Sequence, residues 1–276
     1  MTTSTSAETF LPDEMSRANP RRKREGVRRL GFIILRTMRI CFPERVPRNW
    51  LRRQILKYKQ NIPREFMMGS GDVVVQVGTP QTETLARISN NIGPNGKALI
   101  IEADIDNVQR LTEFAKTTQL QNVIIVHCAA DQEPGTVEFL VSKKWCGNHR
   151  IADEAIVNDN DHLEIEGTGS DYLRRSVKAD TVSAICQQNG IDHIDYIEIA
   201  VNGAEVRVLR GLGEILAKTK RLFVKGHSRN KESGEPINVE IQSLLDAEKF
   251  QTFLTRPAKS HVGKWGNREG DVYAWR

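Results

Sequence analysis

Two short apolar runs, with a helical pattern between them, open the globular part of the chain. The run 73–77 is rich in β-branched residues and is interrupted only by Gln76, which is typical of a strand buried on both faces of a parallel sheet. Residues 85–92 then carry Leu and Ile at helical spacing, and 98–102 is a second apolar run. A strand, a helix and a strand in this order predict a parallel βαβ unit.

The alternation of strands and helices continues to the C-terminus. Two strands follow the last helix directly, which indicates an antiparallel hairpin at one edge of the sheet. We therefore predict an α/β fold with a doubly wound, mostly parallel, seven-stranded sheet and an antiparallel terminal hairpin. That ending is typical of the class I methyltransferase version of the Rossmann-like fold. Further helices are expected at 104–118, 179–189, 203–218 and 237–248, and further strands at 122–128, 135–141, 193–199, 222–224, 250–255 and 271–275.

Composition divides the chain into three regions. Residues 1–25 are predicted to be a disordered basic tail, 26–65 a basic amphipathic helical extension, and 66–276 the globular domain. Within the domain, 142–176 has no clear period and is rich in acidic residues. A stretch of this length is usually a functional lid or a disordered insert, and we expect it to shape the substrate site.

The positive charge of the chain belongs to its N-terminal part. Residues 1–65 hold 16 Lys and Arg against 6 Asp and Glu, a balance of +10, and the remainder holds 24 against 29, a balance of −5. Arginines within 21–41 lie opposite an apolar face that includes Ile34 and Met38. Such a helix can contact an anionic membrane surface, or pack on the domain with its basic face in water. The scarcity of interleaved aromatic residues disfavours nucleic acid as its partner.

The composition also bears on the compartment. No run reaches the roughly 18–20 apolar residues that span a bilayer, and the first ten residues lack the order of a signal peptide. The four cysteines have no CxxC spacing, so neither a zinc site nor a disulfide framework is expected. We therefore expect a cytoplasmic protein, peripheral at a membrane if 21–41 binds one.

The first two strand ends carry the pattern of a nucleotide-type ligand site. In a doubly wound sheet the ligand lies beyond the carboxyl ends of the strands. Gly78 follows the first run, within the segment Gln76-Val77-Gly78-Thr79, and would let a cofactor approach the backbone. Glu102 ends the second strand, 24 positions later, where a carboxylate can accept hydrogen bonds from ribose hydroxyls. A turn glycine and a solvated carboxylate are the alternatives.

The third strand end offers small side chains and one acid. Ala129 and Ala130 leave space for a flat adenine, and Asp131 can accept from its amino group. His127 alternates with apolar residues, which favours a packed histidine over a catalytic one. Cys128 has no activating neighbour in the sequence and is expected to be a small buried apolar residue.

Together these segments resemble the FkbM family of S-adenosylmethionine-dependent methyltransferases. The most specific match is 191–205 with 208–211 after it, and the softer matches are Val77-Gly78, 93–97, 120–123, 129–130 and 135–139. The resemblance implies S-adenosylmethionine as cofactor and methyl transfer to a hydroxyl of a small molecule, sugar or glycan. The cofactor-binding residues would be Gln76, Gly78, Thr79, Glu102, Ala130 and Asp131, and the catalytic candidates are Glu198, Asn202, Glu205 and His227.

Several polar positions depart from the family pattern. Gln76 replaces its usual aspartate, Thr82 a glycine, Ala200 and Asn202 two acids, and Lys225 stands where an acidic residue is common. These departures favour an alternative function, a catalytically degenerate relative that acts as a binding or scaffold module. Two catalytic candidates also have structural alternatives, since Glu205 can cap a helix and Glu198 can pair with an arginine.

Overall fold

The computed structural model describes the globular part of the chain. Its contacts divide the chain into Met1–Met67 and Met68–Arg276, and the described residues, 68–78, 81–143, 149–152, 156–158, 172–226, 228–230, 236–254 and 271–276, all lie in the second unit. The predictions for 1–25, 26–65 and 21–41 therefore lie outside the described residues. So do those for Thr79 and His227.

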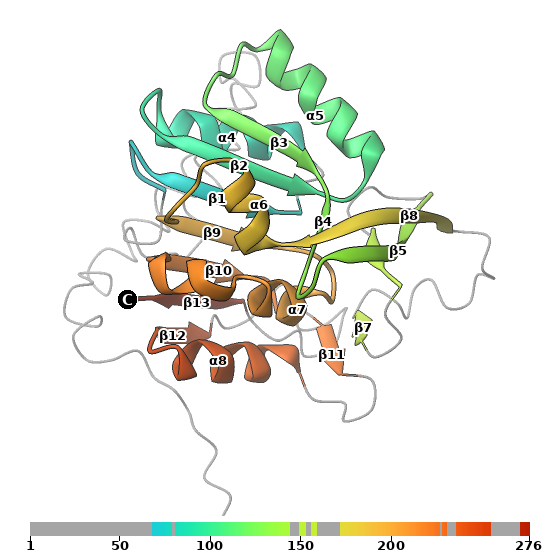
Figure 1. The fold of residues 1–276 in the computed structure, drawn as a ribbon, viewed down its shortest axis with the longest axis vertical. Coiled ribbons are helices and arrows are strands. Elements are labelled where there is room, and N and C mark those ends of the chain that lie inside the picture. Colours follow the sequence, from blue (N-terminus) through green and yellow to red (C-terminus); the bar gives the residue numbers. More distant parts are fainter. Residues whose placement is uncertain are drawn as a thin grey trace, which may run out of the picture. The chain divides into compact units, whose positions relative to one another are not determined.

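Seven strands form the central sheet (Figure 1), in the order β12-β13-β10-β9-β1-β2-β3. The five strands from β10 to β3 are parallel, and β13 is antiparallel to both β10 and β12. Chain order reverses between β1 and β9, which makes the carboxyl ends of these strands the switch point of the sheet. The predicted seven-stranded fold with an antiparallel ending is confirmed. The strands are β1 (Val73–Val77), β2 (Lys97–Glu102), β3 (Val123–His127), β9 (Tyr196–Ile199), β10 (Arg221–Val224), β12 (Gln251–Leu254) and β13 (Val272–Trp275).

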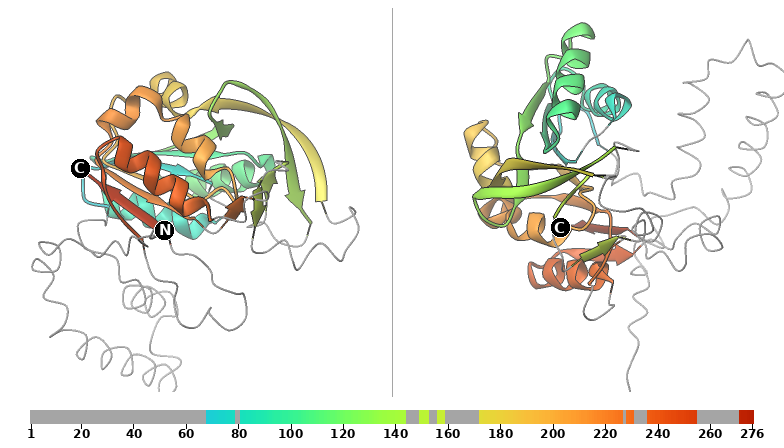
Figure 2. Two further views of the ribbon diagram at one scale, coloured as in Figure 1. Left: turned by 90° about the horizontal axis from the view of Figure 1, so that it is seen from below. Right: turned by 90° about the vertical axis from the view of Figure 1, so that its right-hand side faces the viewer.

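Helices cover both faces of this sheet (Figure 2). On one face lie α4 (Thr82–Ile92), whose predicted apolar stripe is fully buried, and α5 (Ile105–Thr117). On the other lie α6 (Val182–Gln188), α7 (Glu205–Arg210) and α8 (Ile237–Ala247). The main core lies between the sheet and these three helices, because alternate apolar residues of β1, β2, β9 and β10 point toward them.

A second sheet extends from the carboxyl edge of the first. It has the order β4-β8-β5-β6, and β4 follows β3 after Cys128 alone. The predicted strand 135–141 is β5, and it belongs to this sheet. The strands are β4 (Ala129–Asp131), β5 (Gly135–Ser142), β6 (Arg150–Ile151) and β8 (Tyr172–Thr181), and a separate pair joins β7 (Ile156–Asn158) to β11 (Ser228–Asn230).

The aperiodic stretch 142–176 contains strand residues where the structure describes it. Its last residues, 172–176, begin β8, which pairs with β5 over eight residues. The helix expected at 179–189 begins only at Val182, where the Thr181 hydroxyl accepts a hydrogen bond from Ala184 N–H at 3.1 Å. Long-range pairing decides this region, because only Val177 and Ala179 of the strand are buried apolar positions.

The helix expected at 203–218 is broken in the middle. Helix α7 ends at Arg210, and a 3-10 helix, η3 (Gly213–Lys218), follows. A Cβ atom on Gly211 would lie 2.0 Å from the Asp131 carbonyl oxygen, and Gly213 has φ +47°. The close approach of β4 and this left-handed residue end the helix.

Candidate functional site

A cavity of about 290 Å³ lies at the carboxyl ends of β1, β2, β9 and β10, where the fold predicts a ligand. Strand ends form one side, the start of α4 another, and the second sheet a third. The polar lining residues are Gln76, Gln81, Thr84, Glu102, Asn107, His149, Glu198, Asn202 and Lys225. Among the described residues there is no cluster suited to a metal ion.

Gly78 lets the ends of β1 and β9 come together. Its φ is +76°, and a Cβ atom there would lie 2.3 Å from the carbonyl oxygen of Ala200. Its N–H donates to Ile101 O at 2.9 Å. The glycine is thus required by packing at the cavity, and its predicted contact with a cofactor stays a prediction.

Gln76 brings an unusual acceptor to the same place. The side chain is 1% exposed, and its Nε2 donates to Gly78 O at 3.1 Å. Its Oε1 is buried and has no hydrogen-bond partner among the described residues. A buried carbonyl oxygen without a donor is costly, so this atom suits a ligand that brings an N–H or O–H group.

Glu102 places a carboxylate at the end of β2. The residue is 5% exposed and lines the cavity. Its Oε1 accepts a hydrogen bond from Asp104 N–H at 2.9 Å, which holds the carboxylate at the strand end. The neighbouring strand end contributes Cys128, Ala129 and Ala130, whose small side chains line the same cavity.

The other residues of the third strand end behave differently. Asp131 does not line the cavity: it is 3% exposed, and Arg207 Nε donates to its Oδ1 at 2.8 Å. The packed-histidine prediction for His127 is wrong, since that side chain is exposed and contacts Ala103 O at 3.1 Å. Burial raises the pKa of the Cys128 thiol to about 11, as suits a small apolar residue.

Glu198 brings a second carboxylate to the cavity. The side chain pairs with Arg87, with 3.5 Å between Oε2 and Nη2, so the predicted arginine partner exists. Glu198 and Ala200 both line the cavity. They face the same side of the sheet because alternate residues of a strand share a face.

The loop after β9 separates the two remaining candidates. Asn202 lines the cavity, has φ +53°, and donates from Nδ2 to His149 O at 3.0 Å. Glu205 does not line it: its carboxylate accepts from Gly203 N–H at 2.8 Å at the start of α7. Glu205 thus has the geometry of the capping alternative.

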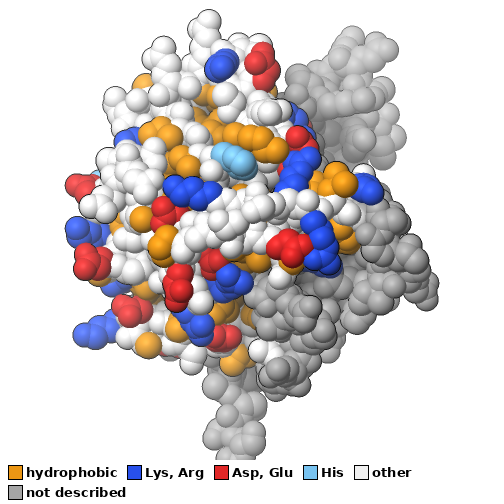
Figure 3. Space-filling view, turned by 45° about the vertical axis from the view of Figure 1, so that its right-hand side comes forward, with side chains coloured by type: hydrophobic (Ala, Val, Ile, Leu, Met, Phe, Trp, Pro, Cys, Tyr) orange, Lys and Arg blue, Asp and Glu red, His pale blue; other side chains and the backbone are white. Residues whose placement is uncertain are grey.

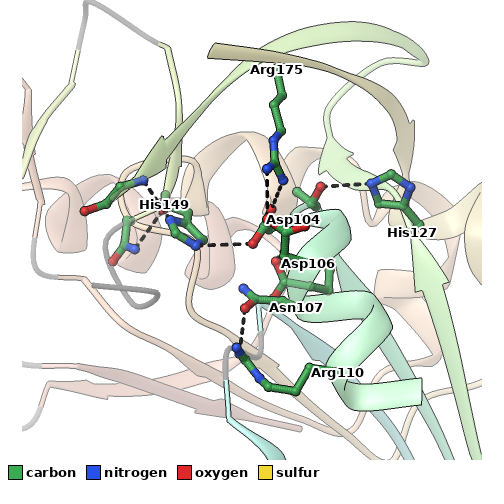
Figure 4. A network of polar contacts seen from close by, with 11 residues as sticks. Asp104, Asp106, Asn107, Arg110, His127, His149 and Arg175 are labelled. Atoms are coloured by element: carbon green, nitrogen blue, oxygen red, sulfur yellow. Dashed lines mark hydrogen bonds and ion pairs between the residues drawn. The ribbon is translucent and has the colours of Figure 1, made fainter. Parts of the chain in front are cut away.

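His149, which lines the cavity, belongs to a network of charged side chains centred on the buried Asp104 (Figure 4). Arg175 of β8 donates to Asp104 Oδ1 at 2.7 Å, and His149 Nε2 lies 3.3 Å from Asp104 Oδ2. His149 Nδ1 accepts from Ser142 N–H at 3.0 Å, so the ring proton is on Nε2, facing Asp104. The network joins three separate segments of the chain.

The network also sets the charge of Asp104. Burial raises the pKa of this carboxyl, but the hydrogen bond with His149 and the positive charge of Arg175 lower it, and the net pKa lies below the ordinary 3.8. The carboxylate therefore stays ionised at neutral pH. Sequence analysis missed His149 because it lies in the aperiodic stretch, whereas Asp104 is recognisable as a polar residue directly after a strand.

Surface charge outside the cavity is mixed. On the face shown in Figure 3, basic and acidic side chains of the described residues are interspersed. None of the described helices has the length and hydropathy to span a bilayer.

Comparisons with known proteins give a family match and distant structural similarities. No curated protein matches the chain. Among solved structures, similarity is found to Aeropyrum pernix fibrillarin in complex with S-adenosylmethionine (13% identity, 75% of this chain and 67% of that chain, TM-score 0.44). A second is an S-adenosylmethionine-dependent methyltransferase from Aquifex aeolicus (15% identity, 76% and 85%, TM-score 0.39).

The family assignment rests on sequence. The model of the methyltransferase FkbM domain matches residues 72–254, which is more than half of the chain and includes every residue that lines the cavity. The chain therefore belongs to the FkbM family of S-adenosylmethionine-dependent methyltransferases.

Proposed function

We propose that this chain transfers the methyl group of S-adenosylmethionine to a hydroxyl of a small molecule, sugar or glycan. The observation that carries the proposal is the juxtaposition of Glu102, Gln76 and Glu198 in one cavity at the switch point of the sheet. Glu102 and Gln76 are suited to binding the cofactor, and Glu198 is suited to accepting the proton of the methylated hydroxyl.

The lining residues fit the chemical groups of the cofactor. Gln76 Oε1 is buried without a described partner and suits the ammonium group. Glu102 at the end of β2 suits the ribose hydroxyls, and the small side chains of Ala129 and Ala130 suit the adenine. When bound, S-adenosylmethionine supplies an electrophilic methyl group.

The residues of the chain then have to orient the acceptor and take up its proton. Glu198 is our candidate for the proton acceptor, because its carboxylate lines the cavity and is buried. The pairing with Arg87 is long, at 3.5 Å. Asn202, held by His149 O, is our candidate for orienting the acceptor.

The remaining predicted residues have smaller parts in this proposal. Asp131 is bonded to Arg207, and Glu205 to the backbone before α7, so we assign neither of them a contact with ligand. Gly78 has its packing role. Thr79 and His227 stay predictions.

A binding or scaffold function is the second candidate. Ala200 at the end of β9 favours it, because this cavity residue offers no acid or base. Such a protein would keep the cofactor site and lack methyl transfer. The two candidates therefore agree on binding and differ on turnover.

Binding and turnover can be measured on the same full-length protein. Calorimetric titration with S-adenosylmethionine and its demethylated product should give saturable binding, and Glu102→Gln should weaken it by about 10- to 100-fold because a charged hydrogen-bond partner is lost. The matched control is Glu138→Gln, an exposed carboxylate paired with Arg174.

Turnover is then tested with methyl-labelled cofactor and a small-molecule extract. Label in an acceptor, lost in Glu198→Gln, supports the enzyme. Binding without label in any acceptor supports the scaffold alternative. Failure of the cofactor to bind at millimolar concentration would contradict both.

A further inference from the structure

We propose that Lys225 binds an anionic group of the methyl acceptor, so that the acceptor is a phosphorylated, sulfated or carboxylated hydroxy compound. This inference rests on the proposed function. It concerns a part of the cavity, at the end of β10, to which the proposed cofactor contacts assign no role.

Strand register places Lys225 beside Ala200. Phe223 is level with Glu198, and Lys225 N–H donates to Ile199 O at 3.0 Å. Since alternate residues share a face, Lys225 lies on the same face of the sheet as Glu198 and Ala200. All three line the cavity, and the methyl side chain of Ala200 leaves room between the two charged ones.

The Lys225 ammonium group has no described counter-ion. The residue is half-buried, and no carboxylate among the described residues lies within ion-pairing distance of it. The two carboxylates that line the cavity are engaged elsewhere, Glu102 with Asp104 N–H and Glu198 with Arg87. A partly desolvated cation is stabilised by an anion, and a ligand in the cavity can supply one.

The place of Lys225 favours the acceptor over the cofactor as the source of that anion. The order of strands is β10-β9-β1, so β9 separates Lys225 from the proposed cofactor contacts of β1 and β2. Glu198 of β9 is then adjacent to both sites. An acceptor anchored at Lys225 would present its hydroxyl beside this carboxylate.

Inorganic phosphate is a suitable probe, because it carries the charge without the rest of an acceptor. We would titrate it by calorimetry and phosphorus NMR into the full-length protein saturated with the demethylated cofactor. Lys225→Gln should weaken phosphate binding by about tenfold or more, and Lys225→Arg should stay within about threefold because the charge remains. Lys116→Gln, an exposed position in the last turn of α5, is the matched control.

Two results would overturn the inference. Phosphate affinity can be unchanged in Lys225→Gln, or phosphate can fail to bind the wild type at tens of millimolar. In the first case, Lys225→Gln can also weaken binding of the demethylated cofactor. The anion would then be the carboxylate of the cofactor itself.

The charge of the labelled product gives an independent measurement. A small-molecule extract is separated by anion exchange into neutral and anionic fractions, and each fraction is incubated with methyl-labelled cofactor. Label in the anionic fraction supports the inference, and label only in the neutral fraction overturns it. If the cofactor does not bind, the proposed function fails, whereas phosphate binding that depends on Lys225 in the protein alone would still locate the anion site.

Discussion

Polar groups are hydrogen-bonded to one another at the amino ends of the central strands and face a ligand cavity at the carboxyl ends. At the amino ends, Asp195 accepts from Val73 N–H at 2.8 Å and from Lys220 Nζ at 2.7 Å. Arg221 donates to Asp195 O at 2.9 Å and to Asp72 Oδ2 at 2.8 Å. One network of hydrogen bonds thus joins the starts of β1, β9 and β10.

At the carboxyl ends, polar groups face a cavity instead. Gln76 Oε1 and the Lys225 ammonium have no described partner, and Glu198 has a long one at 3.5 Å. The comparison distinguishes polar groups that stabilise the fold from polar groups that are available to bind a ligand. Satisfied groups lower the free energy of the fold, whereas groups that await a ligand add little to it and leave binding energy available.

The largest expected effect is on turnover at the carboxyl end. Glu198→Gln keeps the shape of the side chain and removes its basicity, so kcat should fall by about 10²- to 10⁴-fold with little change in cofactor affinity. Steady-state kinetics and calorimetry measure the two quantities. Glu240→Gln, an exposed partner of Arg210, is the control. Unchanged kcat in Glu198→Gln would remove this residue from the mechanism.

The next effect is on stability at the amino end. Asp195→Ala leaves Val73 N–H without its acceptor and should lower the free energy of unfolding by about 1–3 kcal/mol, with kcat per folded molecule unchanged. Urea unfolding measures the loss. Asp192→Ala is the control, because that side chain is 89% exposed and should change stability by less than about 0.5 kcal/mol. A lower kcat per folded molecule in Asp195→Ala would contradict the assignment of stability to the amino ends and function to the carboxyl ends.

A third prediction concerns the pH dependence of the network at the cavity. The pKa of Asp104 lies below its usual 3.8, so its contribution to stability is complete above about pH 4 and is lost as the pH falls through the lower, folded value. Asp104→Asn should therefore cost about 1–3 kcal/mol at pH 7, and the difference from wild type should shrink below pH 4. Urea unfolding across this range would show it. A difference independent of pH would mean that packing, not charge, is responsible.

The smallest effect is expected at the helix that borders the cavity. Arg87 of α4 is about half exposed, so Arg87→Gln should change the free energy of unfolding by at most about 1 kcal/mol. Its loss removes the side chain that pairs with the Glu198 carboxylate, so steady-state kinetics should show a small decrease in kcat. Unchanged kcat in Arg87→Gln would show that Arg87 does not position Glu198.

Much of the cavity was predictable from the sequence. Gly78 and Ala130 come after predicted strands and Glu102 ends one, and the carboxyl ends of parallel strands meet at one edge of a sheet. Local pattern therefore brought these three residues to one place. The direction in which a side chain points could not be predicted in this way. Asp131 also follows a strand, yet it turns to Arg207, 76 positions later in the chain.

The second sheet was the least predictable part. His149 and Arg175 reach Asp104 from positions 45 and 71 residues away, and no local period marks either of them. The strand β8 was predicted in part as an irregular stretch and in part as a helix. Its pairing with β5 outweighs local preference, because backbone hydrogen bonds and buried apolar side chains along a strand are gained only when the partner is present.

By itself, the sequence determined the order of elements, the seven-stranded sheet with its antiparallel ending, the FkbM resemblance and the strand ends that carry the cavity. These properties depend on periodicity and turn residues, which act over a few positions. Only the tertiary structure decided which polar groups are satisfied. In the folded chain, Asp131 is bonded to Arg207 and Glu205 to the backbone before α7, so neither faces the cavity. Asn202 is bonded to His149, and Gln76 and Lys225 line the cavity. The sequence could not show this, because a hydrogen bond between distant residues exists only after the chain has folded.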